Sequence, residues 1–357
     1  MGNFIKKIFI ILASVTVTLI LLEISLITYA KIILNNSVLI NEDLKKEKEY
    51  LYAPKKNINI IVEDAGQKFI VKTNSIGIRE SNDYSYLNES IILLGDSVIF
   101  GEVNQSETID HFVEELTKIA TLNFGVGGYN TWQEYEFFKD KYDKKFNTKF
   151  LVLGICINDI DMNYFRRAVG YNGRLVVYNY SDKYFENDNY YVFFEKKLKF
   201  FLKKSELVKF IYYKIKSIHF GSTYSKKPLN NSSNYKYIYH KDKFIKRDID
   251  LTIKYIEKIN FFANKNNINF FVTFLPHRLQ FSLSKEEFKK ISIQSKLESI
   301  LEEKNIKIIS TYDSFFKLNQ KESIDKYWRS NDDIHLNAEG NKIIANDIVL
   351  ELKKFMK

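Results

Sequence analysis

Short apolar runs alternate with longer amphipathic stretches along most of this chain. Apolar runs of four to eight residues bounded by turn residues are typical of buried strands, whereas apolar positions repeating every three or four residues predict helices. The pattern predicts strands at 91–94, 120–123, 150–155, 268–275 and 306–310. It predicts helices at 108–118, 132–142, 248–264, 285–303 and 338–355.

Strands that alternate with helices of ten or more residues favour a parallel sheet with helices on both faces. We therefore expect an α/β protein with three layers, α/β/α, around a five-stranded parallel sheet. In such sheets, ligands bind outside the carboxyl ends of the strands.

The first apolar stretch differs from the others in its length. Residues 8–30 are almost wholly apolar and long enough to cross a hydrocarbon core of about 30 Å. The sequence predicts a transmembrane anchor, and a cleaved signal peptide is the alternative because Thr28-Tyr29-Ala30 resembles a cleavage site. Lys6 and Lys7 precede the span without a nearby acid, so we expect a cytoplasmic N-terminus, with the rest of the chain outside the cytoplasm.

The rest of the chain divides by its pattern. We expect a cytoplasmic N-terminus at 1–7, an anchor at 8–30, and a polar stalk at 31–56 with a short helix near 42–52. A hairpin and lead-in follow at 57–89, and the main domain occupies 90–357. The stretch 164–245 breaks the strand-helix alternation and is predicted to be an insertion; a lid, a substrate platform, a membrane-surface element and a helix packed on the core all remain open for it.

Composition excludes several classes of function. The single cysteine, Cys156, forms no internal disulfide and supplies no thiolate cluster, and the five histidines are scattered, so neither a metal nor another cofactor is expected. The net charge of +10 comes from lysines spread along the chain, which indicates a solvated surface first and attraction to an anionic lipid or polymer second. No nucleic-acid-binding pattern is present in the sequence.

The first predicted strand ends in Gly95-Asp96-Ser97, just before a helical segment. A serine in such a turn stands at the carboxyl edge of the sheet, where backbone N–H groups can stabilise an anion. Alone, the tripeptide is also ordinary turn chemistry.

Polar and glycine residues also follow the next strands and the last loop. A glycine-dense turn with Gly127 and Gly128 follows the second strand, and Asn158 follows the third. Near the C-terminus, Asp332 stands three residues before His335, close enough to reach its Nδ1 while Nε2 faces a serine.

Together these residues resemble the four sequence blocks of the SGNH/GDSL hydrolases. The order and spacing of Gly95-Asp96-Ser97, the Gly128 turn, Asn158 and Asp332-x-x-His335 carry the resemblance, which covers roughly 90–357. The 73–79 stretch also looks like a lead-in of membrane-anchored bacterial members. The resemblance implies a flavodoxin-like strand order.

The resemblance implies a role for each matching residue. Ser97 would be the nucleophile, His335 the general base and Asp332 the group that orients it. The Ser97 N–H, the Gly128 N–H and the Asn158 side chain would form the oxyanion hole, in which Gly127 could replace Gly128. Two positions differ from the usual blocks. Val98 stands where leucine is usual, and three residues instead of one separate Gly154 from Asn158.

The implied activity is that of a serine esterase. An anchored, extracytoplasmic member of this family would remove O-acyl groups, acetyl foremost, from cell-surface polysaccharide or envelope glycan. If a sugar hydroxyl accepts the acyl group, the enzyme is an O-acyltransferase; a non-catalytic glycan-binding module is the third hypothesis. His277 and Arg278, after the fourth strand, could line the substrate site, or they belong to an exposed loop.

Overall fold

The computed structural model covers the whole chain, and part of it is described here. The described residues are 2–35, 37–41, 50–64, 66–83, 88–161, 165–169, 175–180, 205, 207–208, 211, 240–244, 246–321, 323–330 and 334–356. The helix expected near 42–52 and the insertion expected at 164–245 lie largely outside these residues.

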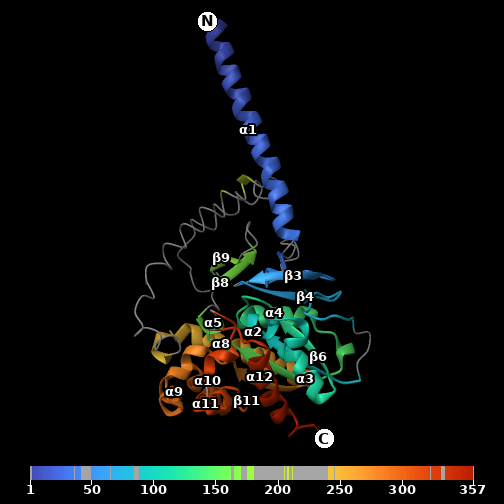
Figure 1. Cartoon of the computed structure of the whole chain (residues 1–357), viewed down its shortest axis with the longest axis vertical. Helices are drawn as coiled ribbons and strands as arrows, with labels where there is room; N and C mark the ends of the chain where they lie inside the picture. Colours follow the sequence, from blue (N-terminus) through green and yellow to red (C-terminus); the bar gives the residue numbers. More distant parts are fainter. Residues whose placement is uncertain are drawn as a thin grey trace. The chain divides into compact units, whose positions relative to one another are not determined.

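A five-stranded parallel sheet forms the centre of the main domain (Figure 1). Its strands are β5 (Ser90–Gly95), β6 (Ala120–Gly125), β7 (Thr148–Ile155), β10 (Asn269–Phe274) and β11 (Lys307–Ile309). They lie side by side in the order β11-β10-β7-β5-β6. The expected five-stranded α/β fold with flavodoxin-like strand order is therefore confirmed.

The strands form where the apolar runs predicted them, because both faces of the sheet are covered. Residues 91–94 of β5 are fully buried, which explains a continuous apolar run instead of alternation. Helices α3 (Ile109–Thr117) and α12 (Ala338–Leu352) pack together, and α4 (Thr131–Lys141), α8 (Lys246–Lys265) and α10 (Ile293–Glu303) form a second group. The two groups flank the sheet (Figure 1).

One expected helix is two. The stretch 285–303 divides into α9 (Lys285–Ile291) and α10, because the Ser292 hydroxyl accepts a hydrogen bond from the Ser295 N–H (3.1 Å) and starts a new helix. The pattern also missed the short helices α5 (Ile157–Asp161) and α11 (Tyr312–Asn319).

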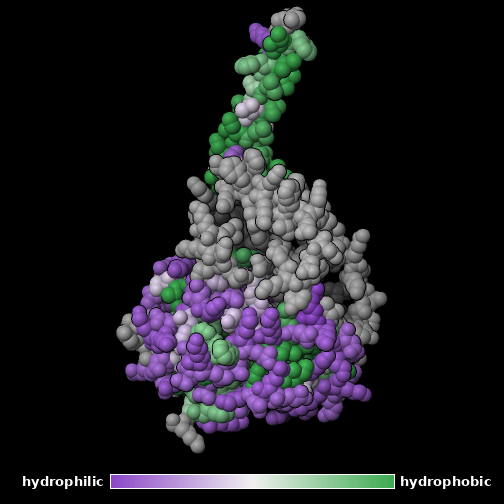
Figure 2. Space-filling view, turned by 180° about the vertical axis from the view of Figure 1, so that it is seen from behind, coloured by the Kyte–Doolittle hydropathy of each residue, from purple (hydrophilic) through white to green (hydrophobic). Residues whose placement is uncertain are grey.

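The N-terminal helix α1 (Gly2–Asn35) contains the apolar span. Residues Phe4–Tyr29 have a mean hydropathy of 2.5, and none of these residues is buried. Figure 2 shows this helix as a hydrophobic column, whereas the visible surface of the main domain is mostly hydrophilic. Within the described residues it is the one helix long and apolar enough to cross a membrane.

The chain divides into two compact units, which we describe separately. One comprises 1–40 and 165–228, and the other comprises 41–164 and 229–357. The first unit contains an antiparallel hairpin of β8 (Phe165–Val169) and β9 (Leu175–Tyr180). The short strand β1 (Leu39–Asn41) lies in the sequence where the first segment of this unit ends.

Glu23, the acid inside the apolar span, is hydrogen-bonded within the first unit. Its Oε2 accepts from the Ser205 hydroxyl (2.9 Å) and from the Leu207 N–H (2.8 Å). The Ser205 hydroxyl in turn accepts from the Val208 N–H (3.2 Å). The start of a helical turn in the insertion therefore contacts the span.

The end of the expected stalk belongs to the core of the second unit. Residues 50–53 are buried, and β2 (Tyr52–Pro54) runs where a short helix or a polar stalk was expected. The reason is their aromatic content: Tyr50 packs edge-on against Phe137, and Tyr52 packs edge-on against Tyr129. The predicted hairpin follows as β3 (Asn59–Asp64) and β4 (Gln67–Lys72), which pair antiparallel.

Candidate active site

Ser97 is the first residue of a four-residue helix, α2 (Ser97–Phe100), directly after β5. Asp96 caps this helix, because its Oδ1 accepts a hydrogen bond from the Val98 N–H (2.9 Å). The serine therefore stands at the carboxyl edge of the sheet, as predicted, and its backbone N–H belongs to the open first turn of a helix.

Three glycines at the ends of neighbouring strands allow α2 to lie on the sheet. Gly95 is in register with Gly125 on β6 and with Gly154 on β7. A Cβ atom on Gly125 would lie 2.1 Å from the Phe100 nitrogen, and one on Gly95 would lie 2.5 Å from an Ile99 side-chain carbon. The α2 backbone thus occupies the space of a side chain at Gly125, and the Ile99 side chain occupies it at Gly95 and Gly154.

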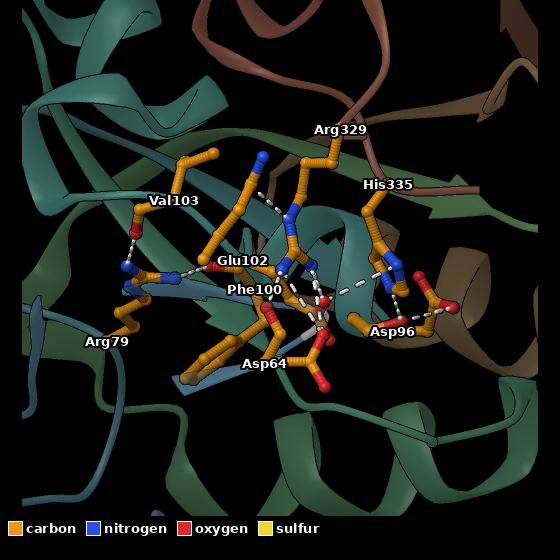
Figure 3. Close-up of polar contacts among 10 residues, drawn as sticks. Asp64, Arg79, Asp96, Phe100, Glu102, Val103, Arg329 and His335 are labelled. Carbon is orange, nitrogen blue, oxygen red and sulfur yellow. Dashed lines mark hydrogen bonds and ion pairs between the residues drawn. The ribbon is translucent and has the colours of Figure 1, made fainter. Parts of the chain in front are cut away.

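His335 approaches Ser97 from the C-terminal loop. Its Nε2 lies 2.8 Å from the Ser97 Oγ (Figure 3). The loop is fixed before and after the histidine: the Arg329 N–H donates to the His335 carbonyl (3.0 Å), and the Asn337 side chain accepts from the Gly340 N–H at the start of α12. The structure therefore brings together two of the predicted site residues that are 238 positions apart.

The third strand end reaches the same place. The Asn158 side-chain amide donates to the Asp96 Oδ2 (3.3 Å), the oxygen that also accepts from the Ser97 hydroxyl (3.3 Å). An amide group has two N–H donors, so the contact with Asp96 uses only one of them. The longer spacing between Gly154 and Asn158 is thus accommodated without moving Asn158 away from the serine.

The glycine-dense turn lies beside the serine. A Cβ atom on Gly127 would meet only the Ser97 Cβ, at 4.0 Å, and Gly128 has a φ of 76° in the left-handed region, which favours glycine. The Tyr52 hydroxyl donates to the Gly127 carbonyl (3.1 Å). Since the C=O and N–H of one trans peptide point in opposite directions, Tyr52 fixes the orientation of the Gly128 N–H.

Several charged and polar residues around the histidine escaped the sequence reasoning. Glu102 Oε2 lies 3.5 Å from the His335 Nδ1, and Arg329 forms an ion pair with Glu102. No sequence pattern links Arg329 to Glu102, which lies more than 200 residues earlier. The one signal in the sequence for a role of Glu102 is its nearness to Ser97. Asp332 lies outside the described residues, so its expected contact with His335 stays a prediction.

His277 and Arg278 occupy different environments. His277 is buried, and its Nδ1 accepts from the Leu279 N–H (3.2 Å) at the start of η6 (Arg278–Ser282). Arg278 lies 3.5 Å from Asp325 and lines a cavity of about 410 Å³ formed by η6 and η7 (Ile324–Tyr327). The arginine therefore lies on the wall of a cavity, whereas the histidine caps η6, and the expected substrate contact of both residues stays a prediction.

Buried acids lie beneath the site. Burial raises the pKa of Asp96, although the Val98 N–H and the charge of His335 oppose this shift. Burial, followed by the charge of Asp96, raises the pKa of Glu134 well above its ordinary value. Burial likewise raises the pKa of the Cys156 thiol, so this cysteine stays protonated and unreactive.

No family model matches the chain, and no curated protein matches its sequence. Among solved structures, similar ones include a member of the lipolytic protein G-D-S-L family from Veillonella parvula (14% identity, 74% of this chain and 98% of that one, TM-score 0.39). Others are a GDSL-like lipase from Bacteroides thetaiotaomicron (13%, 75% and 89%, 0.37) and an acetyl xylan esterase (14%, 74% and 99%, 0.41). At these identities, the likeness concerns the fold and assigns no substrate. The solved structures that this chain resembles thus include GDSL-type lipolytic proteins and an esterase.

Proposed function

We propose that this protein is a serine esterase that removes O-acyl groups, acetyl foremost, from cell-surface polysaccharide or envelope glycan. One observation carries the proposal: His335 Nε2 lies 2.8 Å from the Ser97 Oγ at the carboxyl edge of a parallel sheet. A serine is activated as a nucleophile by a base in hydrogen-bonding contact.

The chemistry follows from this geometry. His335 takes the Ser97 proton through Nε2 while Oγ bonds to the carbonyl carbon of the ester. The ester C–O bond then breaks, and the imidazolium returns the proton to the leaving alcohol. Water, activated by the same imidazole, attacks the acyl-enzyme and frees the acid and the serine.

In this proposal, three donors stabilise the negative oxygen of the tetrahedral intermediate. They are the Ser97 N–H, the Gly128 N–H oriented by Tyr52, and the second N–H of the Asn158 amide. Loss of one such donor typically costs about 2.7–4 kcal/mol of transition-state stabilisation. In this proposal Asp332 orients His335, as the SGNH/GDSL resemblance implies.

The choice of substrate rests on the anchor and on the resemblance. The apolar span at 8–30, with Lys6 and Lys7 before it, favours a cytoplasmic N-terminus and an active site outside the cytoplasm. Acylated glycans are the substrates that the SGNH/GDSL resemblance implies for an anchored enzyme in that position. Arg278, on the wall of its cavity, is the residue we assign to substrate contact.

The test is p-nitrophenyl acetate hydrolysis by the full chain in detergent, with Ser97→Ala as the variant and Ser299→Ala, an exposed serine on α10, as the matched control. We expect Ser97→Ala to abolish turnover and Ser299→Ala to retain it. Equal rates for all three proteins would refute the proposal. Release that requires an added glycan acceptor would instead indicate an O-acyltransferase, and glycan binding without turnover would indicate a binding module.

A further inference from the structure

Both ring nitrogens of His335 have a partner among the described residues. Nε2 contacts Ser97 on one side, and Nδ1 lies 3.5 Å from the carboxylate of Glu102 on the other (Figure 3). Both partners come from the same short stretch of chain, since Glu102 follows Ser97 by five residues. The stretch that carries the nucleophile therefore also carries a negative charge to the far side of the base.

We propose that Glu102 is a positioning residue for His335, in addition to the expected Asp332. The buried Arg329 links Glu102 to the β3–β4 hairpin. The carboxylate fixes the imidazole plane and favours the imidazolium that forms when His335 takes the Ser97 proton. This inference rests on the proposed esterase function.

Arg329 holds the Glu102 carboxylate in place. Its side chain is fully buried, and Nη1 forms an ion pair with Glu102. On its other side, Nη2 donates to the Asp64 carboxylate (3.2 Å) and the Asp64 carbonyl (2.9 Å), and Nε donates to Gln67 (3.1 Å). Among the described residues, this one guanidinium thus meets two carboxylates, those of Glu102 and Asp64.

A second buried arginine fixes the backbone around Glu102. Arg79 donates to the Phe100 carbonyl (2.6 Å) and to the Val103 carbonyl, the two ends of the Glu102 loop. Its guanidinium also lies over the Phe100 ring, 4.7 Å from the centroid. Because both ends of the loop are hydrogen-bonded to one buried, planar guanidinium, Glu102 has little freedom to leave His335.

The charged groups that face His335 predict the direction of the effect. Among the described residues these groups are Asp96, Glu102 and Arg329, and Arg329 is shared with Asp64. Removing the Glu102 charge leaves Arg329 less compensated, so the imidazolium loses stabilisation. An opposite charge within about 4–6 Å shifts a pKa by about one unit or more, which corresponds to roughly a tenfold change in rate.

The experiment compares Glu102→Gln with wild type in the full chain in detergent. The first readout is the His335 pKa, which is measured by titrating the imidazole NMR resonances. The His335→Gln variant assigns these resonances. We expect Glu102→Gln to lower this pKa by about one unit. The second readout is the pH dependence of kcat/KM with p-nitrophenyl acetate. We expect the plateau to be about tenfold lower and the acidic limb to move to lower pH by about one unit, as the His335 pKa does.

Two further variants keep the inference testable if Glu102→Gln folds poorly. Asp64→Asn leaves Glu102 intact and should shift the pKa in the same direction by less. Glu63→Gln is the matched control, because the neighbouring carboxylate on the same strand pairs with the exposed Lys68 and should change neither readout.

The inference is overturned if Glu102→Gln lowers kcat/KM but leaves the His335 pKa and the acidic limb at their wild-type positions, since a merely structural role has that signature. Its failure is distinct from failure of the esterase proposal. If Ser97→Ala retains full turnover, the esterase proposal falls, while the NMR titration still decides whether Glu102 acts on His335.

Discussion

The packing of α2 on Gly125 allows one prediction to be worked out from distances. A methyl group added at Gly125 would lie 2.1 Å from the Phe100 nitrogen and 2.7 Å from the Ile99 carbonyl carbon. Ordinary van der Waals contact begins at about 3.4 Å, so α2 would have to move away by about 1.3 Å. Because the obstructing atoms are backbone on a buried helix, no side-chain rotation relieves the overlap.

We therefore expect Gly125→Ala to be destabilising at the upper end of the range for overpacking, by about 3 kcal/mol. For a domain of this size that lowers Tm by roughly 6–12 °C. A displacement of about 1 Å in the nucleophile also breaks its contact with His335 and lowers kcat by about a hundredfold. Thermal unfolding followed by circular dichroism and the p-nitrophenyl acetate rate measure the two effects.

The matched control for stability is Gly127→Ala in the neighbouring turn. A Cβ atom there would meet only the Ser97 Cβ, at an ordinary 4.0 Å, so its Tm should stay close to that of wild type. If Gly125→Ala unfolds within about 2 °C of wild type, α2 does not press on the strand end, and the reasoning is refuted.

Three further predictions concern single side chains. Tyr52→Phe removes the hydroxyl that holds the Gly127 carbonyl and should lower kcat about tenfold, whereas Tyr50→Phe, whose hydroxyl contacts Asp140, should not; steady-state rates compare them. Burial raises the pKa of Glu298 to about 7, so wild type should lose about 1–3 kcal/mol of stability relative to Glu298→Gln between pH 4.5 and 7. If the urea unfolding midpoints of wild type and Glu298→Gln change in parallel across this pH range, this prediction is contradicted. Arg278→Ala should raise KM for a glycan ester without lowering kcat, as initial rates would reveal.

The sign of the Glu298 effect follows from proton binding. A carboxyl group with a raised pKa binds more protons in the folded state than in the unfolded one, so its stabilising contribution is complete below pH 4.5 and is lost as pH rises through about 7. A glutamine at this position cannot titrate. It can still accept the hydrogen bond that the Tyr312 hydroxyl donates to Glu298.

Local pattern was enough to predict the sheet and the place of Ser97. Residues 91–94 form a continuous apolar run because both faces of the strand are buried, and such a run has few alternatives. The approach of His335 to Ser97 depended on the resemblance to a known family, since no local signal links residues 238 positions apart.

Contacts that join distant segments through charged side chains were not predictable. Arg329 reaches Asp64 across 265 residues, and a lone arginine before a loop gives no indication that its guanidinium is buried. The charged residues before Tyr52 predict a stalk there, whereas its burial depends on Tyr129, a contact that no local pattern indicates.

The contact between Glu23 and the insertion bears on how the chain matures. A leader peptide is discarded, so nothing in the finished protein should depend on it. Here, cutting after Ala30 would take away the carboxylate that accepts from the Ser205 hydroxyl and the Leu207 N–H. If the segment is retained, Glu23 keeps these contacts in the mature protein. The stretch that resembles an export signal would then be a permanent part of the unit in which the insertion folds.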